Sequence, residues 1–374
     1  LANSPRTLLI AYSILIVVCG TLYNRFEAGT PERSGAEAME SVTGPKDVIW
    51  DITYACPLRC FHCYSESGRR VARQLGPDDL LRLTEAVLRF QPRSVTISGG
   101  EPLLVKGVFE VARRFGEAGV ERLLYTSGWT LDETLARQAV ASFDRICVSV
   151  DGATAEVHDR IRGRRGSFDR ALNALGLLDR AAGDRVPYGV DFTVVRSNFD
   201  QITDACALLG ARFPRLRTIF FGAAVPSGLA SRADFAGREL LTEEQRERLV
   251  DPDFVAGLRA ATPGAAWVGT TDNRVLQMHP ERVRSAADFP VAQVEPDGAV
   301  RAMSIYEGTV GNLLTDDPDL VWRRAVDRWR DPFVVAALGP AHTAVQWAEA
   351  ARRIDLRFGS DDDRARIARR PAHR

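Results

Sequence analysis

The segment Asp51-Ile-Thr-Tyr-Ala-Cys56-Pro-Leu-Arg-Cys60-Phe-His-Cys63-Tyr64 carries three cysteines in the spacing Cys-x3-Cys-x2-Cys. Thiolates are soft ligands that suit iron–sulfur clusters and zinc, and a structural metal site normally closes with four ligands. No fourth cysteine lies nearby, so three ligands on one loop leave a metal position open for chemistry. The alternative is a structural zinc loop completed by His62 or a distant residue, although zinc loops favour paired Cys-x2-Cys elements.

The bulk composition limits the function classes. The chain has 374 residues with zero net charge, which suits one large domain with a small appendage. No basic stripe crosses the middle of the chain, so we expect no nucleic-acid partner. The six cysteines are too few and too unevenly spaced for a secreted disulfide framework. Because an oxygen-sensitive cluster needs a reducing compartment, we expect the folded domain in the cytoplasm.

The N-terminal segment is apolar. Residues 8–22 carry no charge but fall short of the roughly 20 residues that span a bilayer. They could be a short membrane anchor, the core of a signal peptide, or sequence translated from a wrongly chosen start upstream of Met39. A secretory signal would export a cluster enzyme away from its reductant, so it ranks last. We expect membrane contact only if residues 8–22 are an anchor.

From residue 47 onward, short β-branched runs alternate with amphipathic stretches, which is the pattern of βα units in a parallel sheet. Six such units predict an α/β fold, a partial (β/α)6 TIM barrel that leaves one side open for a bulky substrate. The strands that we expect cover residues 48–54, 94–98, 122–126, 145–150, 189–195 and 217–221. The helices that we expect cover residues 78–90, 105–118, 132–142, 168–182 and 200–211.

The pattern changes after the barrel. Residues 291–301 predict a hairpin, because Pro296-Asp297-Gly298 separates two alternating runs. A helix is expected near residues 318–330, and the low apolar content from Gly359 onward predicts a frayed or disordered terminus. The domains that follow are residues 1–45, an apolar or flexible extension; 46–262, the barrel; 263–335, a small α+β extension; and 336–374, a C-terminal helix and charged tail.

Polar residues follow the predicted strands, where active sites of such barrels collect. Ser98-Gly99-Gly100-Glu101-Pro102 ends the second strand, and its glycines let the backbone approach a ligand while Glu101 can accept a hydrogen bond from an ammonium group. Ser149 and Asp151 end the fourth strand on one face. Taken singly, these are ordinary turn residues or a core hydroxyl. Their succession along the strand ends favours a binding site.

Together these segments resemble the SPASM-related branch of the radical S-adenosylmethionine (SAM) superfamily. The cysteine loop, the Gly-Gly-Glu-Pro segment and Ser149–Gly163 carry the resemblance, and Cys63–Arg70 is most similar to the mycofactocin peptide maturases. The similarity covers residues 47–225, with a weaker similarity at 290–325. The weaker similarity implies that residues 263–335 are a degenerate SPASM- or twitch-like extension. It implies one 4Fe–4S cluster, bound SAM and a flavodoxin- or ferredoxin-type electron donor. It also implies reductive cleavage of SAM to a 5′-deoxyadenosyl radical that abstracts a substrate hydrogen.

The resemblance assigns roles to single residues. The implied cluster ligands are Cys56, Cys60 and Cys63. The implied SAM contacts are His62 near the adenine; Gly99, Gly100 and Glu101 at the amino group; Ser149 and Asp151 at the ribose; and Arg162 near the carboxylate. The third strand ends in Thr126-Ser127-Gly128 where relatives usually have Thr-Asn-Gly, which weakens the case for a SAM contact from Ser127. No catalytic residue is assigned.

Two features of the branch are missing. Relatives carry further cysteines after the barrel that bind auxiliary clusters, whereas this chain has none after Cys206 and reads Arg301-Ala302-Met303-Ser304 where one is expected. Without an auxiliary cluster to take an electron, a redox-neutral outcome such as decarboxylation, epimerisation or elimination is favoured. From the few residues given before the first strand, we also expect no leader-peptide-binding domain.

These absences favour a tailoring enzyme that acts on a small polar metabolite, such as a sugar or nucleoside, in natural-product biosynthesis. One alternative is a maturase of a ribosomally made peptide, similar to the mycofactocin enzyme. The other is a non-catalytic protein that binds the cluster without turnover. Substrate specificity is expected from the ends of the fifth and sixth strands, at Thr193, Arg196 and Phe221.

Overall fold

The parallel sheet that the βα pattern predicts organises the computed structural model, which describes residues 44–183 and 185–373. Within these residues the strands lie in the order β10-β9-β8-β1-β2-β3-β4-β5-β6-β7. Neighbours from β1 to β7 pair in parallel, and β8 pairs in parallel with β1. The strands are β1 (Asp47–Asp51), β2 (Ser94–Ser98), β3 (Glu121–Thr126), β4 (Arg145–Ser149), β5 (Tyr188–Val194), β6 (Thr218–Ala223), β7 (Trp267–Thr271), β8 (Val291–Val294), β9 (Ala299–Arg301) and β10 (Thr309–Asn312).

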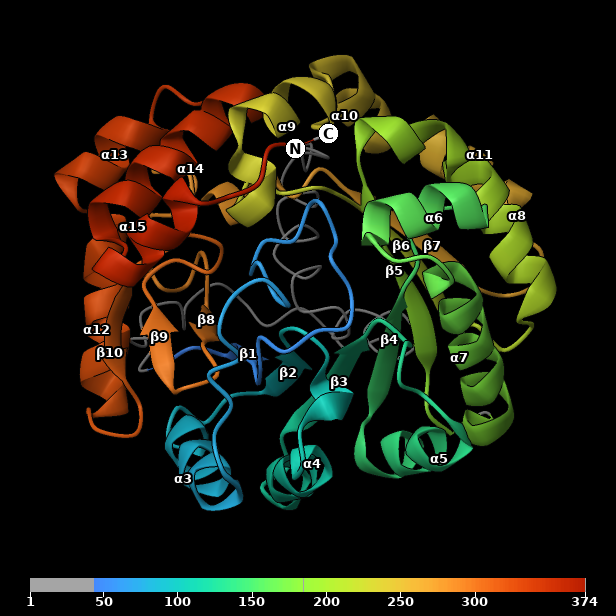
Figure 1. Cartoon of the computed structure of the whole chain (residues 1–374), viewed down its shortest axis with the longest axis horizontal. Coiled ribbons are helices and arrows are strands. Elements are labelled where there is room, and N and C mark those ends of the chain that lie inside the picture. The colour runs from blue at the N-terminus through green and yellow to red at the C-terminus, as the bar shows by residue number, and fades with distance from the viewer. Residues whose placement is uncertain (1–43, 184, 374) are drawn as a thin grey trace, which may run out of the picture.

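Helices cover the outer face of this curved sheet, and its concave side surrounds the loop that follows β1 (Figure 1). The helices of the barrel are α3 (Pro77–Leu88), α4 (Val108–Glu117), α5 (Glu133–Ser142), α6 (Ala155–Arg162), α7 (Ser167–Ala182), α8 (Ile202–Arg212), α9 (Ala233–Arg238), α10 (Glu243–Leu249) and α11 (Pro252–Ala261). The helices after the hairpin are α12 (Pro318–Trp329), α13 (Pro332–Leu338), α14 (Ala344–Phe358) and α15 (Asp361–Ala368).

Each outer helix buries one apolar stripe against the sheet, as α3 illustrates. Pro77 occupies the first turn, where its missing N–H costs nothing, and the helix ends after Leu88. Leu80, Leu83 and Val87 are buried at spacings of three and four residues. Each such side chain contributes roughly 1.5–3 kcal/mol relative to an exposed one, so packing on the sheet stabilises the helix.

The predicted elements are present, and the sheet continues further than six strands. All six expected strands and all five expected helices appear within a few residues of their predicted bounds. β7 adds another parallel strand beside β6, inside the 263–335 segment that the sequence assigns to the extension. This strand is short and contains Gly269, which weakens its sequence signal. The hairpin is confirmed as antiparallel β8 and β9, and it extends the same sheet through β1.

The prediction of a frayed terminus from Gly359 is wrong. α15 begins with a capping box between Ser360 and Asp363. Arg366 and Arg370 then donate hydrogen bonds to the buried carboxylate of Glu66, three residues after Cys63. Composition predicted disorder because it counts apolar residues, whereas this terminus is held by ion pairs with a distant part of the chain.

The apolar segment at residues 8–22 lies outside the described residues. Between residues 44 and 373, the described helices are all too short or too polar to cross a membrane.

Candidate functional site

A cavity of about 300 Å³ lies at the C-terminal ends of the strands, where barrels of this kind place their active sites. Its walls come from the cysteine loop, from β2 to β6 and from the hairpin. The predicted residues that line it are Cys56, Cys60, His62, Cys63, Gly99, Gly100, Ser149 and Arg162. Two other predicted residues, Glu101 and Asp151, are fully buried behind its walls. The structure therefore brings together residues from four separate sequence segments.

The three cysteines line this cavity with free thiols. Burial, and then the neighbouring thiols, raise the pKa of Cys56 to about 12. Burial also raises the pKa of Cys60 to about 11, although the Arg162 guanidinium lowers it. Within the described residues, no group of three or more histidine, cysteine or carboxylate side chains is arranged so that it could hold a metal ion. The donor set of three thiols on one loop fits a cluster with an open position, whose binding would remove their protons.

The glycine pair after β2 makes room for the cysteine loop. The amide of Gly100 donates to the carbonyl of Thr53 at 2.6 Å, and the amide of Glu101 donates to that of Ala55 at 2.9 Å. A Cβ atom on Gly100 would lie 2.1 Å from the carbonyl oxygen of Ala55. Gly99 adopts a φ of 120°, which strongly favours glycine. The close approach that these glycines permit is to the backbone of the cysteine loop, and both also line the cavity.

Glu101 anchors the end of β3 to the end of β2. Its carboxylate accepts hydrogen bonds from the hydroxyl of Thr126 at 2.8 Å and from the amide of Ser127 at 3.0 Å. The Ser127 hydroxyl and the amide of Leu103 also donate to it. Burial raises the pKa of Glu101, while these hydrogen bonds lower it. A direct contact of this carboxylate with an ammonium group stays a prediction.

Asp151 holds two cavity residues in place. Its Oδ2 atom lies 2.7 Å from Nε of Arg162 and 3.0 Å from Nε2 of His62, and its Oδ1 accepts from the amide of Thr193 at 2.9 Å. Burial alone raises the pKa of Asp151, but the Arg162 guanidinium and the His62 imidazole lower it well below its usual range. The same Arg162 approaches Sγ of Cys60 at 3.8 Å. One ionised carboxylate thus orients two of the side chains that line the cavity.

His158 accepts a hydrogen bond from the backbone of Asp151. It lies in α6 and is buried, and its Nδ1 accepts a hydrogen bond from the amide of Asp151 at 3.1 Å. Burial, and then the positive charge of Arg162, lower the pKa of His158 to about 4. The imidazole is therefore neutral at pH 7. No role is assigned to His158 from the sequence, because its partner is a backbone amide that no motif marks.

Asp191 is a cavity residue that the sequence analysis missed. It lies in β5 opposite Ser149 of β4, half-buried, and lines the cavity. Among the described residues no hydrogen bond or ion pair reaches its carboxylate, unlike those of Glu101 and Asp151. Burial, and then the charge of Asp151, raise the pKa of Asp191 to about 7. The available signal was a single carboxylate inside the apolar strand Tyr188–Val194.

The predicted specificity residues separate in space. Thr193 lines the cavity, whereas Phe221 belongs to the apolar core. Arg196 donates to the carbonyls of Gly237 and Leu240 and so ties β5 to the region of α9. Of these three described residues, Thr193 lines the cavity and the other two do not.

Comparison with known proteins agrees with this geometry. The chain matches the family model described as "Radical SAM superfamily" over residues 50–209. It is 36% identical over 310 residues to the mycofactocin maturase MftC of Mycobacterium ulcerans (strain Agy99), and the match covers 79% of each chain. The chain belongs to the radical SAM superfamily. Members of this superfamily are enzymes that use a 4Fe–4S cluster and SAM, and this radical SAM enzyme takes both cofactors.

Other relatives match over shorter stretches. The chain is 33% identical over 192 residues to the AdoMet-dependent heme synthase of Methanosarcina barkeri (strain Fusaro / DSM 804), which covers 51% of this chain and 54% of that protein. It therefore spans about half the length of that relative, and the same share, 54%, of MftC from Mycolicibacterium smegmatis (strain ATCC 700084 / mc(2)155). The solved structure of Streptococcus suis SuiB bound to SAM has the same fold, with a TM-score of 0.57 at 12% identity, covering 86% of this chain and 77% of that one.

The low pKa of His158 predicts a pH-dependent stability. In the unfolded chain the imidazole titrates near its ordinary pKa of about 6.5. Between that value and about pH 4 the unfolded chain binds more protons, so folding stability is fully present above the unfolded pKa and falls as the pH decreases. The variant His158→Asn keeps an acceptor near Nδ1 but does not titrate.

When the pH is lowered from 7 to about 4.5, we expect the free energy of unfolding to fall by about 2 kcal/mol more in the wild type than in His158→Asn. Urea unfolding of both proteins across this range measures the difference. Parallel pH curves for the two proteins would show that the imidazole is not held neutral.

Proposed function

We propose that this radical SAM enzyme matures a ribosomally made peptide. The observation that carries the proposal is the 36% identity to the mycofactocin maturase MftC of Mycobacterium ulcerans, because this match runs through 79% of both chains. A second relative with a peptide in its name, the PqqA peptide cyclase of Granulibacter bethesdensis (strain ATCC BAA-1260 / CGDNIH1), is 25% identical over 274 residues and covers 67% of this chain and 72% of that protein. These relatives support the peptide hypothesis over a sugar or nucleoside substrate.

In this proposal Cys56, Cys60 and Cys63 would hold the cluster. When bound, the cluster and SAM supply a 5′-deoxyadenosyl radical that abstracts a hydrogen atom from the substrate. Arg162, fixed by Asp151, places a positive charge beside Sγ of Cys60 and can attract the SAM carboxylate.

The remaining SAM contacts are proposed from position. His62 lines the cavity beside the cysteines and is held by the same Asp151 carboxylate. Ser149 at the end of β4 and the backbone of Gly99 and Gly100 line the same wall. In this proposal Glu101 does not contact SAM directly but positions the end of β3, because its carboxylate already accepts hydrogen bonds from Thr126 and Ser127.

A redox-neutral outcome, such as a decarboxylation, stays part of the proposal. After β9, where the resemblance predicts a cysteine, Met303, Ile305 and Tyr306 pack into the apolar core. In the described part of the extension, these buried side chains therefore occupy the region where relatives have cluster-binding cysteines. We infer that this chain completes its reaction with the cluster of the cysteine loop.

Asp191 supplies the proposal with a contact for the substrate. Its half-buried carboxyl group lines the cavity, and none of the described residues donates a hydrogen bond to it. A peptide N–H or hydroxyl group that enters the cavity would satisfy it. We therefore propose Asp191 as the residue that accepts a hydrogen bond from the bound substrate.

The first test measures SAM cleavage. Reconstituted enzyme with SAM, a chemical reductant and synthetic peptides encoded by neighbouring small genes should form 5′-deoxyadenosine and a peptide of changed mass. The variant Cys60→Ala should lose both products, because two thiols cannot complete the site. Cleavage stimulated by a sugar or nucleoside and by no peptide would contradict the peptide proposal. No cleavage with any substrate would favour the non-catalytic alternative.

The second test concerns Asp191. The variant Asp191→Asn keeps the shape of the side chain but removes the carboxylate, so the Michaelis constant for the peptide should rise about tenfold or more. The dissociation constant for SAM should change less than about twofold, because Asp191 has no role in holding the cofactor residues. Ser149→Ala, opposite Asp191, is the matched control and should weaken SAM binding instead. Equal effects of both variants on SAM would contradict a substrate role.

A further inference from the structure

A group of exposed arginines borders the cysteine loop. Arg59 and Arg69 lie on the segment that carries the cysteines, and Arg164 and Arg165 follow directly after α6. All four are exposed, and we call them the arginine rim. They approach the loop from two separate elements, so the rim is a product of the fold.

The arginine rim touches the backbone of the cysteine loop. Nη1 of Arg59 donates to the carbonyl of Cys56 at 2.9 Å, and Nη1 of Arg164 donates to the carbonyl of Pro57 at 2.6 Å. Nη2 of Arg69 donates to the carbonyl of Arg59 at 2.8 Å. These contacts hold the guanidinium groups beside the residues that line the cluster end of the cavity. The positive charge therefore lies at the protein surface nearest to that end.

No carboxylate among the described residues forms an ion pair with the arginine rim. Elsewhere on the surface arginines are paired, as Arg113 is with Glu110 and Arg114 with Glu85. Asp159 of α6, which is close in sequence, instead accepts from the amide of Gly166 at 2.6 Å. In a chain of zero net charge, such an uncompensated patch has a local field that attracts an acidic partner.

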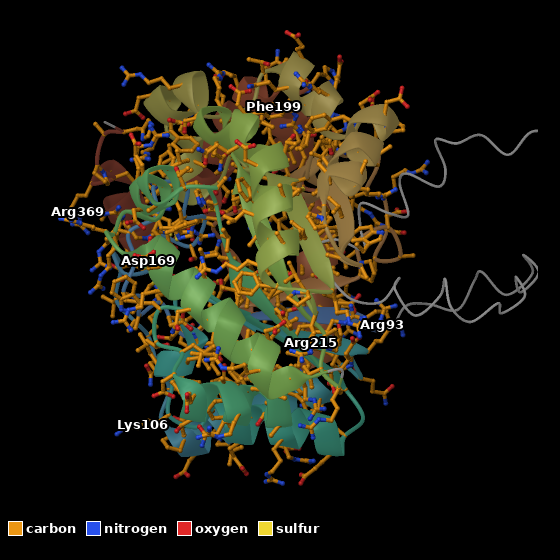
Figure 2. The ribbon with its side chains drawn as sticks, turned by 90° about the vertical axis from the view of Figure 1, so that its right-hand side faces the viewer. Arg93, Lys106, Asp169, Phe199, Arg215 and Arg369 are labelled. Atoms are coloured by element: carbon orange, nitrogen blue, oxygen red, sulfur yellow. The ribbon has the colours of Figure 1, made fainter. Side chains whose placement is uncertain are left out.

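Figure 2 views the molecule from the right-hand side of Figure 1. Its left edge corresponds to the face that Figure 1 shows in front, where the cysteine loop is exposed to view. Arg369, just after α15, projects from that edge and is exposed. Asp169 of α7 is an exposed carboxylate on the same side, and no ion pair joins it to the arginine rim within the described residues.

We propose that the arginine rim docks an acidic one-electron carrier protein that reduces the cluster. The inference rests on the proposed cluster ligands Cys56, Cys60 and Cys63. The carrier loses one electron and the oxidised cluster gains it, and no bond is formed or broken. Complementary charges would increase the association rate and orient the carrier with its redox centre toward the loop.

The test reverses charge at Arg69 and Arg165, which together donate one hydrogen bond to the loop, from Nη2 of Arg69 to the carbonyl of Arg59. The double variant Arg69→Glu/Arg165→Glu changes the rim but leaves Arg59 and Arg164 bound to the loop carbonyls. The matched control is Arg212→Glu/Arg323→Glu, which makes the same charge change at exposed positions at the end of α8 and on α12. All proteins are reconstituted with the cluster and compared at low and high salt.

Two measurements separate docking from catalysis. The first is the dissociation constant for flavodoxin, an acidic carrier, which should rise about tenfold or more in the rim variant and less than about twofold in the control. The second is the rate of 5′-deoxyadenosine formation with reduced flavodoxin and with photoreduced 5-deazaflavin, a small neutral reductant. The rim variant should be slow with flavodoxin and equal to wild type with deazaflavin, and high salt should reduce the difference.

Unchanged affinity for flavodoxin in the rim variant would overturn the docking proposal. An equal loss of rate with both reductants would also overturn it, because the substitutions would then act on the site itself. Failure of wild type to cleave SAM with deazaflavin would instead contradict the proposed function. The affinity measurement would still test the docking surface in that case.

Discussion

The ionised carboxylate of Asp151 ties the cysteine loop to the barrel. It binds His62 of the loop, Arg162 at the end of α6 and the amide of Thr193 on β5. Removing one partner of a buried ion pair leaves an uncompensated charge and costs about 3–5 kcal/mol. The three elements are therefore held in one arrangement, which brings Arg162 to within 3.8 Å of Sγ of Cys60. The chemistry proposed for the cavity depends on this shared contact.

The cysteine loop is also held from its other side. Glycines pack against its backbone, so that a Cβ on Gly163 would lie 2.3 Å from the carbonyl of Arg59 and one on Gly228 would lie 2.1 Å from that of Tyr64. Beyond the last cysteine, Glu66 is bound by arginines of the C-terminal segment. A segment held by so many backbone contacts has little freedom.

The sequence predicted where the site lies better than how its side chains are used. The strand ends, the cysteine loop and Gly99-Gly100 follow from periodicity and spacing, and the structure places them around one cavity. Glu101 was expected to face a ligand, but its orientation depends on hydroxyl donors of β3 that no pattern marks. Asp191 was missed because one carboxylate in an apolar strand gives no motif. The ordered terminus was missed because Arg366 pairs with Glu66 across 300 residues, and composition contains no such information.

The central claim is that the cysteine loop holds the cluster with which this enzyme works. Anaerobic reconstitution followed by iron and sulfide analysis tests it most directly, with the triple variant Cys56→Ala/Cys60→Ala/Cys63→Ala as the comparison. We predict about four iron atoms and four sulfides per wild-type chain and essentially none in the triple variant. Iron and sulfide retained by the triple variant, or about eight iron atoms in the wild type, would contradict the claim.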